Sequence, residues 1–180
     1  MKRILTPLVL IVVLSFTGIN FKQKKENMVY IPSGKLYLNT DTVRINTMYM
    51  SSTEVTNGEY REFLNDLKDN NHLEDLKIAA VNTTNWQAEV YKNYYFSEQR
   101  FNDYPVVNVS KKGAELYAIW YTNLMRQKYP NVNFKDFRLP TKQEWIYAAK
   151  GGLKNSPYPW FGPFARDSKG QLLANFAFKG

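Results

Sequence analysis

A capping-box pattern, Thr-x-x-Glu ahead of a helical apolar stripe, occurs twice in this sequence, at residues 56–59 and 141–144. Each side chain of the pattern satisfies an orphan amide of the first helical turn, so the start of the helix is fixed locally. After the first copy, apolar residues recur at i, i+3, i+4 and i+7, which predicts a helix over residues 57–67. Two helix positions can therefore be inferred before any fold is assumed.

The second copy lies in the stretch RLPTKQEWIYAAKGG, residues 138–152. Thr141 and Glu144 form the box, and Gly151 with the next glycine terminates a short helix. We expect Trp145 and the two alanines of this helix to face inward. Most of the stretch is thus explained by the residues that start and end one helix.

In other parts of the chain the apolar residues do not follow the helical spacing. Residues 28–38 and 43–50 alternate apolar and polar side chains around turn residues, which predicts short antiparallel strands. Residues 104–110 are interpreted as a buried strand that leads into a capped helix over 111–127, whereas 70–104 have no sustained period and are expected to be long and partly irregular. The 180 residues fit one α+β domain with short helices, short antiparallel strands and much irregular chain.

The N-terminal 27 residues are expected to lie outside this domain. Lys2 and Arg3 precede an unbroken apolar run over residues 8–14, which is typical of a secretory signal over 1–20, and a basic tether follows over 21–27. Removal of the signal would take away two cations and lower the net charge from +8 to +6. An uncleaved membrane anchor is the alternative, and both imply an exported protein in the periplasm, on the cell surface or secreted.

Composition excludes several kinds of chemistry. The chain has no cysteine, so thiolate catalysis and disulfides are excluded, and His72, the one histidine, lies in a polar acidic stretch typical of surface. A transition-metal site and a Ser-His-Asp hydrolase are therefore not expected. Basic residues are interspersed with acidic ones, as in residues 61–77, so no nucleic-acid partner is predicted.

Carboxylates suitable for acid-base catalysis are also scarce. Glu54, Glu59 and Glu144 are the candidates, but the last two are accounted for by the capping boxes. Arg138, beside an apolar strand end, is expected to brace several carbonyls with its five donors. No catalytic residue is predicted.

Five motifs in the same order resemble the formylglycine-generating enzyme domain, also called the sulfatase-modifying-factor family. They are EVTNGEYREFL (54–64), YPVVNVSKKGAELYAIW (104–120), RLPTKQEWIYAAKGG (138–152), YPWFG (158–162) and LANF (173–176). The later motifs are similar in style to gliding-motility and type IX secretion lipoproteins. The resemblance implies a C-type-lectin-like fold over residues 28–180. Its structural motif residues are Thr56, Glu59, Arg138, Thr141, Glu144 and Trp145.

Departures from the family pattern limit what the resemblance implies. The enzymes carry a copper-binding cysteine pair in a C-terminal half that would follow LANF, so residues 28–180 are interpreted as the N-terminal part of such a domain. Relatives bind calcium at the LANF turn, which implies Asn175 and Phe176 as ligands here. Calcium is the one cofactor that the resemblance suggests.

These observations favour an exported, non-catalytic interaction module with a protein partner among cell-envelope or secretion components. The aromatic residues expected to bind the partner are Trp86, Tyr158, Trp160 and Phe161, although packing in the core is the preferred role for the cluster over residues 158–164. The alternative is the N-terminal part of a formylglycine-generating oxidase that modifies sulfatases. Glycan binding is a third reading, which rests on fold analogy alone.

Overall fold

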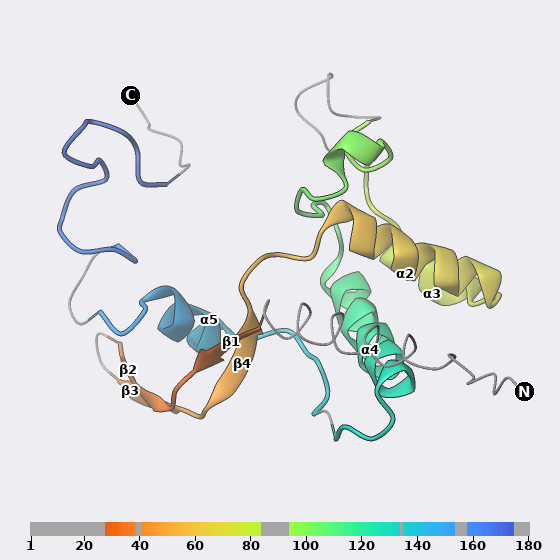
Figure 1. The fold of residues 1–180 in the computed structure, drawn as a ribbon, viewed down its shortest axis with the longest axis horizontal. Helices are drawn as coiled ribbons and strands as arrows, with labels where there is room; N and C mark the ends of the chain where they lie inside the picture. Colours follow the sequence, from red (N-terminus) through yellow and green to blue (C-terminus); the bar gives the residue numbers. More distant parts are fainter. Residues whose placement is uncertain (1–27, 39–40, 84–93, 134, 154–157, 175–180) are drawn as a thin grey trace, which may run out of the picture.

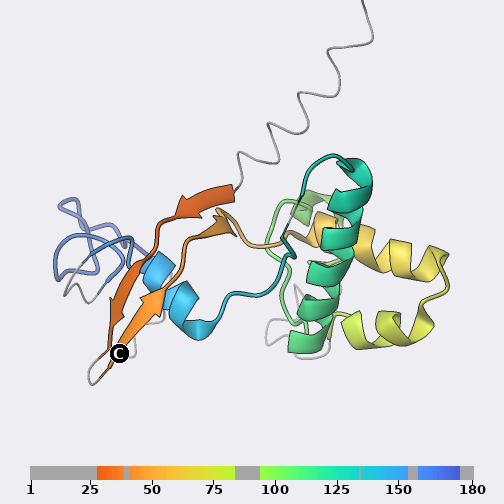
Figure 2. The same cartoon turned by 90° about the horizontal axis from the view of Figure 1, so that it is seen from below.

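The structure is a computed structural model that describes residues 28–38, 41–83, 94–133, 135–153 and 158–174. Its elements form two groups joined by the chain segments 52–56 and 129–141 (Figure 1). One group holds four strands, a short helix and a C-terminal arm, and the other holds three helices. Figure 2 shows the same separation from below. The mixed helices and antiparallel strands confirm the predicted α+β class.

The four strands form one kinked hairpin. Strand β1 (Met28–Ile31) pairs with β4 (Met48–Ser51), and β2 (Gly34–Tyr37) pairs with β3 (Thr42–Ile45), both antiparallel. Ile31 lies opposite Met48 and Gly34 opposite Ile45, so the register is unchanged across the two-residue interruption on each side. Pro32 lies in this interruption, where it has no ladder hydrogen bond to donate. The strands expected from alternation are confirmed.

Helix α5 (Lys142–Ala149) covers one face of this hairpin. Val29, Ile31 and Met50 line a groove together with α5. Farther along, Gly34 lies against Tyr147 of α5, and Leu36 and Ile45 are buried. Because neighbouring side chains of a strand point to opposite faces, the residues between them face away from α5. The hairpin therefore has an inner apolar face and an outer face.

Gly34 sits where α5 approaches the hairpin. A Cβ added there would lie 2.2 Å from the Tyr147 hydroxyl and 3.0 Å from its Cζ. We expect Gly34→Ala to lower the free energy of unfolding by roughly 1–3 kcal/mol, because the ring must move off the strand. Urea unfolding of Gly34→Ala, Tyr147→Leu and the double variant measures the coupling. Equal losses from Gly34→Ala with and without Tyr147→Leu would contradict this explanation.

The main core belongs to the helical group, which contains α2 (Asn57–Asp69), α3 (Leu73–Ala79) and α4 (Lys111–Lys128). Its buried residues are Tyr60, Phe63, Leu67, Ala79 and Tyr117. The Tyr60 hydroxyl donates to the Ala79 carbonyl at 2.9 Å, which joins α2 to the end of α3. Burial raises the pKa of Tyr60 to about 12, so the hydroxyl is neutral over the physiological range.

The helices expected at 57–67, 111–127 and after Thr141 are confirmed within two residues at each end. One other expectation is wrong. Residues 104–110 form no strand: Pro105 makes a single bridge to Thr56, and Val106 donates to the Val55 carbonyl at 2.8 Å. The segment 70–104 contains helix α3 and the 3-10 turn η2 (Gln99–Phe101). Helix α3 is only two turns long and has no side-chain cap, so the sequence contains little local evidence that predicts it.

The predicted signal and tether, residues 1–27, lie outside the described residues. Among the residues that are described, none of the helices is both long and apolar enough to cross a bilayer.

Candidate functional site

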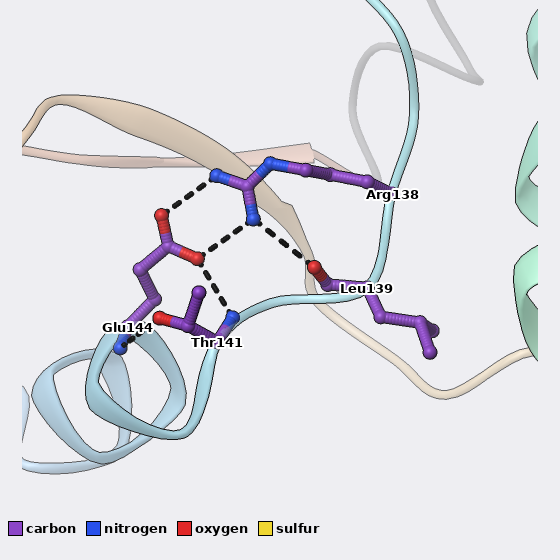
Figure 3. A network of polar contacts seen from close by, with 4 residues as sticks. All are labelled: Arg138, Leu139, Thr141 and Glu144. Atoms are coloured by element: carbon purple, nitrogen blue, oxygen red, sulfur yellow. Dashed lines mark hydrogen bonds and ion pairs between the residues drawn. The ribbon is translucent and has the colours of Figure 1, made fainter. Parts of the chain in front are cut away.

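Arg138, Thr141 and Glu144 form one polar network at the start of α5 (Figure 3). The Arg138 guanidinium donates to both oxygens of Glu144, Nη2 to Oε1 at 2.7 Å and Nη1 to Oε2 at 2.8 Å. The Thr141 amide donates to Glu144 Oε2 at 2.8 Å, and the Glu144 amide donates to Thr141 Oγ1 at 3.2 Å. Both carboxylate oxygens thus accept hydrogen bonds, Oε1 from Arg138 and Oε2 from Arg138 and the Thr141 amide.

Arg138 does not brace several carbonyls, as the sequence suggested. It reaches one, that of Leu139 at 3.0 Å, and its main partner is the Glu144 carboxylate. The bidentate geometry of guanidinium and carboxylate explains this preference, because a paired anion is a stronger acceptor than a neutral carbonyl.

The hydrogen bonds from Arg138, and then that from the Thr141 amide, lower the pKa of Glu144 from 4.5 to about 2. A carboxyl group whose folded pKa is depressed stabilises the fold above its unfolded pKa, and the contribution is lost as the pH falls to the folded value. A carboxylate held in this way is ionised at neutral pH and takes up no proton as a catalytic base.

Acid titration tests this network. We expect Glu144→Gln to lower stability at pH 7 by about 1 kcal/mol, a modest value because Arg138 is largely exposed. The difference between wild type and variant should shrink as the pH falls from 4.5 to about 2. Urea midpoints measured across this range decide the point, with the exposed Glu74→Gln as control. A difference that stays constant with pH would contradict an ionised, paired Glu144.

The first capping box has the same arrangement at α2. The Thr56 amide donates to Glu59 Oε2 at 3.0 Å, and the Glu59 amide donates to Thr56 Oγ1 at 3.2 Å. The four capping residues of the family motif therefore fix the N-terminal ends of two helices, as the sequence predicted. No acid-base pair is formed by them.

The N-terminus of α2 also holds the segment 94–104, which sequence reasoning missed. Asn57 is fully buried, and its Nδ2 donates to the carbonyls of Tyr95 at 3.1 Å and Phe101 at 3.0 Å. Arg61 donates to the Phe96 carbonyl and to Asn102 Oδ1. These partners are 35–44 residues away in the chain, so no local sequence pattern predicts these contacts.

Trp145 is not buried, contrary to expectation. Its side chain is 60% exposed and lies at the rim of the groove of about 330 Å³ that α5 forms with β1 and β4. A two-stranded hairpin is too narrow to cover an indole ring on a helix above it, although Ala148 and Ala149 do face the groove. The inward orientation was thus right for the alanines, while the burial of the indole was not.

The aromatic cluster in the C-terminal arm is also outside the core. Tyr158 and Trp160 stack with centroids 4.8 Å apart, whereas Phe161 and Phe164 are 90% and 73% exposed. The arm folds on itself through an isolated bridge between Arg166 and Leu172, and it extends away from α5 (Figure 1). Packing of this cluster in the core, the preferred expectation, is therefore wrong for the two phenylalanines.

Metal ligands are not assembled in the part of the chain that the structure describes. No three His, Cys, Asp or Glu side chains there form a group that could hold a metal ion, and the chain has no cysteine for a copper-binding pair. His72 is exposed at the start of α3, as predicted. Trp86, Asn175 and Phe176 lie outside the described residues, so partner binding by Trp86 and calcium binding at Asn175 and Phe176 stay predictions.

The fold and these helix caps define an α+β domain whose motif carboxylates are structural. The chain matches the family model of the sulfatase-modifying factor enzyme 1-like domain over residues 17–178. It belongs to this family, whose domain has a C-type-lectin-like fold. The family resemblance inferred from the sequence is confirmed.

Individual relatives match this chain at low identity or over a short stretch. Inactive Cα-formylglycine-generating enzyme 2 of Bos taurus is 25% identical over 77% of this chain and 53% of its own length. Formylglycine-generating enzyme of Bos taurus is 26% identical over 82% of this chain and 45% of its own length. The Thermomonospora curvata enzyme is 40% identical over 58 residues, which are 32% of this chain and 14% of the relative. The chain spans about half the length of the bovine relatives.

Proposed function

We propose that this chain is an exported, non-catalytic interaction module built on a formylglycine-generating-enzyme-like domain. The observation that carries the proposal is the use of the family motif: Glu59 and Glu144 both cap helices, and Arg138 neutralises the second of them. The absence of cysteine from the sequence supports it, since the family's oxidase chemistry is attributed to a cysteine pair. Similarity to relatives named inactive is in accord with this role.

Partner binding is assigned to exposed aromatic side chains. Phe161 and Phe164 in the arm and Trp145 on α5 expose most of their surface to solvent. Exposed aromatic residues of this size are enriched where proteins meet partners. The partner proposed is a protein of the cell envelope or its secretion and gliding machinery.

The competing function is sulfatase modification, as the N-terminal part of an oxidase. It is supported by similarity to the active enzymes, which is as high as that to the inactive ones. The two functions differ in whether a cysteine of a sulfatase peptide is oxidised to formylglycine.

Mass spectrometry of such a peptide separates them. The full chain is incubated in air with a cysteine-containing sulfatase peptide, with and without added copper, and the Thermomonospora curvata enzyme serves as positive control. We expect unchanged peptide with this chain and converted peptide with the control. Conversion by this chain would overturn the non-catalytic proposal. Export is tested separately by the intact mass of protein from its native cells, where loss of residues 1–20 is the expected result.

A further inference from the structure

Asn57 and Gly58 at the start of α2 are the one Asn-Gly pair in the chain. Asparagine is a thermolabile residue, and a following glycine makes it more so, because glycine has no Cβ to shield its backbone nitrogen. The pair is nevertheless enclosed: Asn57 is fully buried, and the Gly58 amide donates to the Asn102 carbonyl at 2.9 Å. A chemically labile pair is thus held inside the helical group.

The reaction open to such a pair is loss of the side-chain amide. The Gly58 nitrogen attacks Asn57 Cγ, so that a bond from this nitrogen to Cγ forms and the bond from Cγ to Nδ2 breaks. The Gly58 amide proton and the side-chain NH₂ group leave together as ammonia, and water then opens the cyclic imide at either of its carbonyls. The product at position 57 is aspartate or isoaspartate, and the reaction needs no oxidant, metal or enzyme.

Three hydrogen bonds oppose this reaction in the folded chain. Asn57 Nδ2 donates to the carbonyls of Tyr95 at 3.1 Å and Phe101 at 3.0 Å, which fixes the side-chain amide. The nitrogen of the next residue is fixed by its own hydrogen bond to the Asn102 carbonyl. All three acceptors lie in the segment 94–104, which packs on the start of α2. This segment must therefore move away before the side chain can turn toward the attacking nitrogen.

We infer that Asn57 is a latent deamidation site, which the closed segment 94–104 protects and whose reaction releases that segment irreversibly. After the reaction a carboxylate faces the two carbonyls that Nδ2 had bound, so repulsion replaces both hydrogen bonds. Isoaspartate also lengthens the main chain by one carbon within the first turn of α2. The segment can open and close while Asn57 is intact, but it cannot close in the same way after the amide is lost.

Peptide mapping by mass spectrometry tests the protection on the full chain, stored at mildly alkaline pH. A synthetic peptide of residues 54–64 gives the unprotected rate, since a helix of this length is not stable alone. We expect deamidation at Asn57 to be at least roughly a hundredfold slower in the folded chain, because only molecules with an open segment react. A folded chain that reacts as fast as the peptide would show that the segment does not protect Asn57.

Two matched arginine variants test whether opening of the segment controls the rate. Arg61 donates to the Phe96 carbonyl and to Asn102 Oδ1, so Arg61→Met should accelerate deamidation roughly tenfold below the urea transition. Arg126→Met removes the bond to Asp136 instead, and its rate should stay within about twofold of wild type. Urea midpoints establish that both variants are folded. An unchanged rate in Arg61→Met would mean that the reaction does not pass through this opening.

The deamidated wild-type protein tests the release. It carries one more negative charge, so ion exchange separates it from the intact chain. Hydrogen exchange should show lost protection of residues 94–104 and retained protection of α4 (Lys111–Lys128). Normal protection of residues 94–104 in this product would overturn the inference. This test and the comparison with the peptide use the wild-type chain only, and none of the results depends on a partner or on oxidation of a sulfatase peptide.

Discussion

Replacement of Phe63 by alanine is expected to lower the free energy of unfolding by about 3–5 kcal/mol. Phe63 is fully buried, and its ring contacts those of Tyr60, Tyr117 and Trp120 at centroid distances of 5.3, 5.6 and 5.4 Å. The variant loses these edge-to-face and tilted contacts and leaves a cavity between α2 and α4. Because small domains are stable by only about 5–15 kcal/mol, urea unfolding followed by tryptophan fluorescence should show a large shift of the midpoint.

Phe161→Ala provides the matched control, since it removes the same ring from a side chain that is 90% exposed. Its effect should stay within about 0.5 kcal/mol. A comparable loss in the two variants would mean that the arm is packed in solution and that the helical group is not the main core.

Replacement of Asn57 by alanine is expected to cost about 2–5 kcal/mol. The variant removes both amide donors from the carbonyls of Tyr95 and Phe101, and each carbonyl is then left without this partner in a closely packed place. Asn57→Asp should be at least as damaging, because a carboxylate would face the same two carbonyls. The effect should appear as lost protection of the segment 94–104 in hydrogen exchange, as well as in urea unfolding.

Asn70→Ala is the control for this variant. Asn70 is an exposed asparagine at the other end of α2, where its amide donates to the Asp66 carbonyl at 2.9 Å. We expect its loss to cost less than about 1 kcal/mol. Normal protection of residues 94–104 in Asn57→Ala would show that the backbone bonds from α2 suffice to hold the segment.

The predictable parts of the fold were those determined by neighbours in sequence. The two capping boxes fixed the starts of α2 and α5 because donor and acceptor are three residues apart. The strands of the hairpin followed from alternation, and the structural role of Glu59 and Glu144 followed from the caps. In each case local hydrogen bonds or the pattern of apolar residues favour the observed conformation of the segment over other conformations.

The remaining features depend on contacts that are distant in sequence. The network of Asn57 and Arg61 joins residues 35–44 positions apart, and the exposure of Trp145 depends on the width of the sheet below it. The apolar run at 104–110 resembled a strand, yet its backbone pairs only through Pro105 and Val106 with the start of α2. For the outer face of the hairpin, alternation could place the side chains, whereas pairing of Lys35 with Arg44 required the register.

The division into two groups of elements has a consequence for how the molecule unfolds. The element pairs that pack closely lie within one group or the other, α5 with the hairpin and α2 with its neighbouring helices. Segments 52–56, 129–133 and 135–141 are the described parts of the connections between them (Figure 1). We therefore expect each group to unfold as a separate cooperative unit, so that denaturation proceeds in two steps that different probes report differently.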